Sequence, residues 1–190
     1  MGSRPSLTSS SKGVQVSSHR KIALVTGAFF IITIIPAPIA AFILYAPVLS
    51  DPDYVVGAGA DTSVRLGAFL EVIIAIAIIG TAVTLFPIVK RQNEGFALGY
   101  VAARVLESTV IVVGIISLLS VVTLRQDLAG AAGADAASLV TVSKSLVAVH
   151  DWTFLLGPGF VPGVNGVLLG IWLIVKGFNP SAPLLTASDT

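Results

Sequence analysis

Long apolar runs separated by short polar segments dominate this chain. The four longest cover about residues 22–48, 67–89, 98–124 and 152–176. Each is long enough to cross the hydrocarbon core of a bilayer as an α-helix, which needs roughly 20 residues. The pattern therefore predicts an all-α integral membrane protein, built as a four-helix bundle with an additional short amphipathic helix before the last span.

The first apolar run begins at Ile22, after a polar, Ser-rich segment over residues 1–21. We interpret that segment as a disordered cytoplasmic tail, because it holds too few apolar side chains to form a core. The apolar part of a cleavable signal peptide has only about 7–15 residues, so this longer run is predicted to be an uncleaved first span. Pro36 and Pro38 lie in its middle and should kink it.

The last third of the chain allows two interpretations, because residues 139–175 are too many for one span and few for two. In the first, residues 136–149 form a weakly amphipathic helix at the interface or against the bundle. Asp151 then caps a final span over residues 152–176. In the second, the helix breaks at Gly157-Pro158-Gly159 and the chain forms a re-entrant hairpin.

The distribution of basic residues favours four spans. They gather before the first span, between the second and third, and after the fourth: Arg20, Lys21, Lys90, Arg91 and Lys176. Four spans place all of these on the cytoplasmic side, as the positive-inside rule requires, whereas a fifth span would place Lys176 outside. We therefore expect both termini in the cytoplasm.

Composition supports a membrane protein and excludes several kinds of site. Of the 190 residues, 55% are hydrophobic and 11% charged, whereas soluble domains carry about 25% charged residues. Cysteine is absent and only His19 and His150 are histidines, so we expect no disulfide, thiolate, metal site or cofactor. The net charge of +1 suggests no nucleic-acid partner. Residues 22–177 are predicted to be one transmembrane domain, and residues 178–190 a C-terminal tail.

Arg104 and Glu107 form the first candidate site. They stand three residues apart in the third span and therefore share a helix face. Charges inside a span cost about 2.5–3.5 kcal/mol each and are often functional. We expect an ion pair facing the bundle interior, with Thr81 or Thr84 of the second span supplying hydrogen bonds. The pair either binds a headgroup, ion or small anion, or only orients the two helices.

A second candidate site is predicted near the outer ends of the second and fourth spans. Glu71, His150, Asp151 and Trp152, with Arg65, fall at similar depths there and could line an outward-facing pocket. A carboxylate beside a histidine is suited to proton relay or general acid–base chemistry. The alternative is ordinary: Trp152 anchors at the interface, Asp151 caps a helix and Glu71 snorkels to the surface.

Small residues mark one face of the last span. The glycines follow i, i+4, i+7, i+11 spacing: Gly159, Gly163, Gly166 and Gly170. Such a face lets another backbone approach closely. We expect it to pack inside the bundle, against Gly114 and its neighbours in the third span, and homodimerisation is the alternative.

Four stretches resemble the bacterial membrane-protein family labelled domain of unknown function 4386. They are RLGAFLEV (65–72), KRQNEGFALGYVAARVLES (90–108), HDWTFLLGPG (150–159) and LIVKGFNPSA (173–182). Members of that family are often longer, so the resemblance implies a shortened member in a bacterial cytoplasmic (inner) membrane. It implies no reaction and no catalytic residues.

Three functions follow from these observations. The first is binding of a small molecule, lipid or partner through a polar pocket inside the membrane. The second is a membrane enzyme or proton-coupled carrier that uses Glu71, Glu107, His150 and Asp151. The third is a structural or assembly subunit that associates through the glycine face. The lack of a recognisable nucleophile or metal set favours a protein that is not an enzyme, with the lipid bilayer as its main partner.

Overall fold

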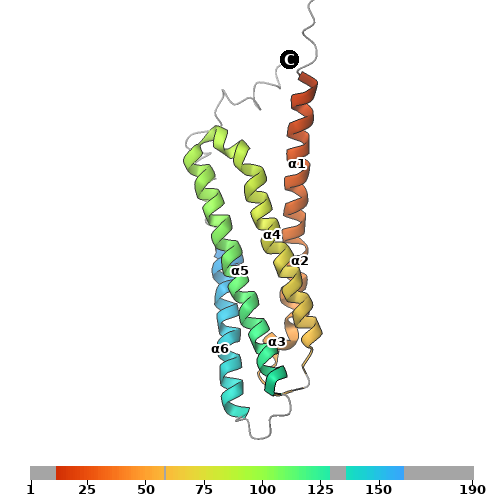
Figure 1. The fold of residues 1–190 in the computed structure, drawn as a ribbon, viewed down its shortest axis with the longest axis vertical. Helices are drawn as coiled ribbons and strands as arrows, with labels where there is room; N and C mark the ends of the chain where they lie inside the picture. The colour runs from red at the N-terminus through yellow and green to blue at the C-terminus, as the bar shows by residue number, and fades with distance from the viewer. Residues whose placement is uncertain (1–11, 58, 129–135, 161–190) are drawn as a thin grey trace, which may run out of the picture.

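The computed structural model describes residues 12–57, 59–128 and 136–160 of the chain (Figure 1). Nearly all of these residues are helical, and four helices are long and apolar enough to cross a membrane. These four are Leu24–Leu44, Asp61–Gln92, Glu94–Asp127 and Ala136–Phe160. The prediction of an all-α membrane protein with four spans is confirmed.

The helices fall into a broken first arm and three longer elements. The first arm comprises α1 (Lys12–Ile34), α2 (Pro36–Ile39), the π-helical segment η1 (Ala40–Leu44) and α3 (Ala46–Ser50). The remainder comprises α4 (Asp61–Gln92), α5 (Glu94–Leu128), α6 (Ala136–Phe154) and the π-helical segment η2 (Leu155–Phe160).

Two prolines interrupt the first arm, as the sequence predicts. The regular helix ends at Ile34, and Pro36 opens α2, because a proline has no N–H to donate and its ring clashes with the preceding turn. Beyond Pro38 the chain takes the wider π geometry, in which the N–H of Tyr45 donates to the carbonyl of Ala40 at 3.0 Å. The kink is thus spread over two turns of helix.

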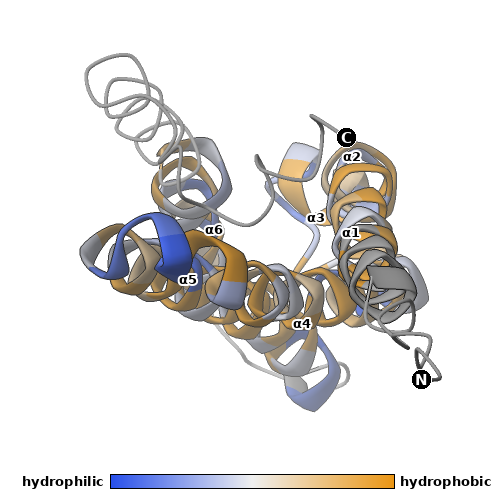
Figure 2. Ribbon diagram, turned by 90° about the horizontal axis from the view of Figure 1, so that it is seen from above, coloured by the Kyte–Doolittle hydropathy of each residue, from blue (hydrophilic) through white to orange (hydrophobic). Residues whose placement is uncertain are grey.

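The antiparallel hairpin of α4 and α5 forms the centre of the fold. It turns at Asn93, whose side-chain oxygen accepts a hydrogen bond from the N–H of Phe96 at 3.0 Å and so caps α5. The first arm packs on α4, and α6 packs on α5 (Figure 1). Seen from above, the helices follow a U-shaped path, with α3 of the first arm between α6 and α2 (Figure 2).

We call the end of the hairpin at Asn93 the turn end and the opposite end, where α4 begins and α5 finishes, the open end. Two buried apolar clusters fill the bundle. At the open end lie Tyr45, Val48, Tyr54, Val55, Val64, Leu118, Val121 and Val122. Further towards the turn end lie Ala68, Ile74, Ala75, Ile78, Ile111 and Ile115.

The exterior of the bundle is apolar as well. Side chains such as Phe42, Phe69 and Ile76 are 76%, 65% and 65% exposed. In water such a surface would drive association, whereas lipid tails solvate it at no cost. The helices therefore present to their surroundings the surface that a bilayer requires.

A polar network, the open-end clasp, fastens α4 to the end of α5. The guanidinium of Arg125 forms an ion pair with Asp61, with Nε 2.7 Å from Oδ1, and its Nη1 donates to the carbonyl of Gly57 at 3.0 Å. Tyr54 and Gln126 also donate to the Asp61 carboxylate, at 2.8 and 2.6 Å. Burial, and then the bond to Asp61, raise the pKa of Tyr54, so its phenol remains a neutral donor.

The last described helix differs from the prediction in its boundaries. We expected an amphipathic helix over residues 136–149 and a new span capped by Asp151. Instead α6 runs without a break from Ala136 to Phe154, and Asp151 lies inside it. The chain also stays helical through Gly157-Pro158-Gly159, in π geometry, to Phe160. The helix continues because Ser143 and His150 are buried on the same side, which holds both halves against the bundle.

Close helix packing occurs at glycines other than those we predicted. A Cβ added at Gly67 of α4 would lie 2.6 Å from the ring of Tyr45, and one at Gly80 would lie 2.7 Å from the ring of Phe29. Real Cβ atoms do not approach other atoms this closely, so a larger residue at either position would have to displace the ring packed on it. Aromatic side chains of the first arm therefore pack directly on the backbone of α4 at Gly67 and Gly80.

The predicted glycine face falls mostly outside the described residues. Gly159 is exposed, and a Cβ added there would meet only ordinary contacts. The other three members, Gly163, Gly166 and Gly170, lie outside the part of the chain that the structure describes. Gly114, which we expected to face them, lies against α6 instead, where a Cβ would come within 2.6 Å of Thr153 Oγ1.

The glycine at position 67 gives a direct test of this packing. Gly67→Ala should destabilise the protein by about 1–3 kcal/mol, because its methyl group would push the buried ring of Tyr45 out of place. Thermal unfolding in a mild detergent measures the change.

Gly99→Ala on α5 is the matched control, since a Cβ there meets nothing within 4 Å. It should leave the melting temperature unchanged or raise it slightly, because alanine favours helix over glycine. Equal melting temperatures for the two variants would show that Tyr45 does not need the space at Gly67.

Candidate functional site

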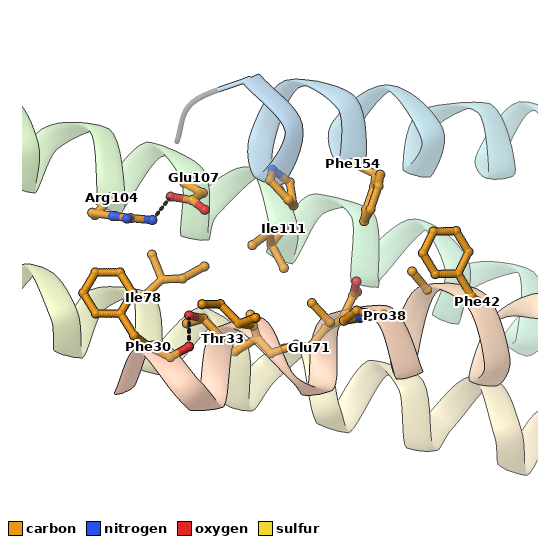
Figure 3. A pocket seen from close by; sticks show the side chains of 15 residues that line it. Phe30, Thr33, Pro38, Phe42, Glu71, Ile78, Arg104, Glu107, Ile111 and Phe154 are labelled. Atoms are coloured by element: carbon orange, nitrogen blue, oxygen red, sulfur yellow. Dashed lines mark hydrogen bonds and ion pairs between the residues drawn. The ribbon is translucent and has the colours of Figure 1, made fainter. Parts of the chain in front are cut away.

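A cavity of about 410 Å³ opens between the first arm and α5, with α4 at its base (Figure 3). Its walls are mainly apolar. They include Phe30, Ile34, Pro38, Phe42, Ile74, Ile78, Ile111, Phe154 and Pro158. Three ionisable side chains also line it: Glu71, Arg104 and Glu107.

Both π-helical segments border this cavity. Ala41 and Phe42 of η1 line it from the first arm, and Pro158 of η2 lines it from the end of α6. Pi-helical turns are rare in proteins and often occur at functional sites, because they leave backbone groups and side chains out of the regular helical array. Two such turns at one cavity mark it as a specialised part of the fold.

The predicted ion pair between Arg104 and Glu107 is present and faces the cavity. Arg104 Nη1 lies 2.8 Å from Glu107 Oε2, and the two side chains are 14% and 5% exposed. Arg104 Nε also donates to the hydroxyl of Tyr100 at 3.3 Å, and its guanidinium lies over that ring. Because all three residues belong to α5, the pair is organised by one helix before any neighbour packs against it.

The prediction that Thr81 or Thr84 donates a hydrogen bond to this pair is wrong. Thr81 donates to the carbonyl of Ile78 in its own helix, at 2.7 Å. Thr84 bonds back to its own helix and meets the hydroxyl of Thr26 of α1 at 3.0 Å. Similar depth in the membrane did not place these hydroxyls on the side of α4 that faces Arg104.

Glu71 lies in the same cavity and is 8% exposed. The alternative in which Glu71 snorkels to the surface is therefore wrong. Its Oε2 accepts a hydrogen bond from the hydroxyl of Tyr45 at 2.9 Å. Among the residues that the structure describes, no ion pair involves Glu71. Sequence reasoning assigned Glu71 to a different site from Arg104 and Glu107, and the structure brings the three together.

The second predicted site does not form as one pocket. His150 is buried, with its ring 5.3 Å from that of Tyr45 in an edge-to-face arrangement. Asp151 is exposed and borders a separate cavity of about 160 Å³, whereas Trp152 points outward and is 63% exposed. Arg65 is exposed as well and donates to Gln126 at 2.7 Å.

The separation follows from helical geometry. Successive residues of an α-helix point about 100° apart, so His150, Asp151 and Trp152 face three directions. The four residues proposed for an enzyme or proton-coupled carrier therefore divide between the main cavity, the protein interior and a second cavity.

Tyr45 is the residue of this region that sequence reasoning missed. Its side chain is fully buried, its hydroxyl holds Glu71 and its ring contacts His150. A signal was present in the sequence, because a tyrosine buried among apolar residues needs a partner for its hydroxyl. Glu71 is the only acidic residue of the apolar run that follows.

The cavity combines charged groups with aromatic and apolar surface. It offers two carboxylates, one guanidinium and several aromatic rings inside apolar walls. Within the described residues, no group of three or more His, Asp or Glu is placed to hold a metal ion. Ser108 is also engaged elsewhere, because its hydroxyl donates to the carbonyl of Ala75 of α4 at 3.2 Å.

Removing each partner of the buried pair should have unequal effects. Arg104→Ala leaves Glu107 as an uncompensated buried charge, so we expect a loss of about 3–5 kcal/mol in stability. Glu107→Gln keeps the shape of the side chain, and Arg104 still has Tyr100 as a partner, so the loss should be smaller. Expression level and melting temperature in detergent measure the difference.

Lys90→Ala provides the matched control for charge removal. Lys90 and Glu94 form an exposed i,i+4 pair at the turn end, and such pairs contribute little to stability. If Arg104→Ala and Lys90→Ala behave alike, the Arg104–Glu107 pair does not stabilise the bundle.

Comparison with known proteins gives a family and no function. No curated protein and no solved structure matches the chain. Residues 25–184 match the family described as a domain of unknown function (DUF4386). This range includes the four apolar helices, apart from Leu24 at the start of the first, and every residue that lines the main cavity. The chain therefore belongs to the DUF4386 family.

Proposed function

We propose that this membrane protein binds a small molecule with an apolar body and a polar head in the cavity between the first arm and α5. One observation carries the proposal: three ionisable side chains from inside the spans, the buried Glu71 and Glu107 and the half-buried Arg104, line one mainly apolar cavity. A concave, mostly apolar site with a few converging polar groups is the usual form of a small-molecule site.

The energetic cost of these charges supports a function beyond folding. Each charge at the centre of a span costs about 2.5–3.5 kcal/mol on insertion scales. Arg104 and Glu107 offset part of that cost through their 2.8 Å ion pair. Glu71 has no ion-pair partner among the described residues, and the single hydrogen bond from the neutral hydroxyl of Tyr45 offsets only part of the cost of its charge.

The position of the cavity supports entry from the membrane. Ile34 and Phe42, which line its edge, are largely exposed on the outer surface of the bundle. The cavity thus reaches the surface on which lipid tails lie. An apolar molecule dissolved in the bilayer could enter there without crossing the aqueous phase.

Native mass spectrometry of the full chain, released from a mild detergent, tests this proposal. We expect a bound small molecule of constant mass on the parent protein. Ala41→Phe should abolish that species, because the added ring would project into the cavity from a half-buried position.

Ile43→Phe is the matched control, since Ile43 belongs to the same π-helical segment and is largely exposed. Melting temperatures of both variants distinguish a filled cavity from a damaged fold. Retention of the same ligand by folded Ala41→Phe would overturn the proposal.

We also propose that both termini lie in the cytoplasm and that the membrane is the inner membrane of a bacterium. Lys90 and Arg91 lie at the turn end of the hairpin. At the open end the charge of Arg125 is compensated by its ion pair with Asp61. At the turn end Lys90 is paired with Glu94, and Arg91 adds a further positive charge, so the net positive charge of this end favours a cytoplasmic position.

Reporter fusions test the orientation. A fluorescent protein that matures only in the cytoplasm should be bright when fused before Met1 or after Thr190. An alkaline phosphatase fused within the segment between Ser50 and Asp61 should be active, because that segment would face the periplasm. Phosphatase activity from a fusion after Thr190 would contradict the proposed orientation.

A further inference from the structure

We infer that the molecule bound in the main cavity is an organic cation, with its positive head beside Glu71 and its apolar body along the phenylalanine-lined wall. This inference rests on the proposed function and adds the chemical class of the ligand.

The charges that line the cavity do not balance. Arg104 is engaged with Glu107 at 2.8 Å and with Tyr100 at 3.3 Å, so its charge is already used within α5. Glu71 receives a single hydrogen bond, from the neutral phenol of Tyr45. With both carboxylates ionised, the cavity carries one negative charge that no described residue neutralises.

Glu71 is held in place from behind the cavity. Tyr45, its hydrogen-bond donor, does not line the cavity, and its ring is fully buried between Gly67 and His150. The phenol therefore fixes the carboxylate without covering the side that borders the cavity. This arrangement presents a positioned anion to an incoming ligand, which strengthens attraction to a cation in a low-dielectric site.

The wall of the cavity also suits a cation. Phe30, Phe42 and Phe154 line it, and the faces of aromatic rings attract positive charge while offering apolar surface to the rest of the molecule. An anionic ligand would meet two carboxylates against one paired guanidinium. A neutral ligand would leave the charge of Glu71 uncompensated.

Binding of three matched probes to the full chain tests the inference. The probes share a phenylbutyl body and differ in the head: trimethylammonium, the neutral tert-butyl isostere, and sulfonate. Radiolabelled compounds report binding of all three probes in the same way, and a neutral, mild detergent adds no charge of its own. The charge of the head is then the only variable. We expect the parent to bind the cation about tenfold or more tightly than the neutral isostere, and the sulfonate least.

Two substitutions locate the preference. Glu71→Gln should remove the advantage of the cation and leave binding of the neutral isostere unchanged. Glu71→Leu repeats the test with a side chain that needs no hydrogen bond, in case Glu71→Gln fails to fold. Glu94→Gln, an exposed carboxylate at the turn end, is the control and should keep the full preference.

The outcomes separate this inference from the proposed function. Equal binding of cation and isostere to the parent, as expected if Glu71 holds a proton, would overturn the inference, as would a preference that survives both Glu71 substitutions. If the isostere binds and Ala41→Phe blocks it, the cavity remains a binding site of different chemistry. If no probe binds and the native mass spectrum shows no ligand, the proposed function itself fails.

Discussion

The burial of Tyr45 is the interaction on which the described bundle depends. Its ring packs against the backbone at Gly67 of α4 and so holds the first arm on that helix. The same ring contacts that of His150 of α6 edge to face. It also belongs to the apolar cluster that includes Leu118 of α5. One side chain thus touches or shares a core with every major element. Its hydroxyl must find an acceptor in that setting, and the acceptor is Glu71.

This contact explains why a carboxylate persists at position 71 in an apolar span. A buried phenol without an acceptor would destabilise the fold by the full desolvation penalty of its hydroxyl group. A carboxylate is also a stronger acceptor than a neutral group. The same hydrogen bond keeps the carboxylate at the border of the main cavity. The hydrogen bond between Tyr45 and Glu71 therefore completes the apolar core and, in the function we propose, also positions the charge that a ligand would contact.

Depth along the first three spans could be predicted from the sequence, whereas the bounds of the last described helix and the direction around each helix could not. Counting residues at about 1.5 Å each locates these three spans and the levels of Glu71 and Glu107. The Arg104–Glu107 pair was predictable because spacing within one helix fixes both depth and direction. The grouping of Glu71 with Asp151, and of Thr81 with Arg104, failed because it joined different helices by depth alone. Which sides face each other depends on helix order and on contacts such as that of Tyr45.

The open-end clasp divides the molecule into parts of different stiffness. The α4–α5 hairpin is joined covalently at Asn93 and tied again at its far end by Asp61 and Arg125, so it behaves as a closed frame. The N-terminal half of the first arm is held to α4 by the hydrogen bond between Thr26 and Thr84 and by the packing of Phe29 on Gly80. Its helix is then interrupted at Ile35 and widened over η1. Breaks of this kind concentrate bending. We therefore expect bending that changes the width of the main cavity to occur at this break in the first arm rather than within the α4–α5 hairpin.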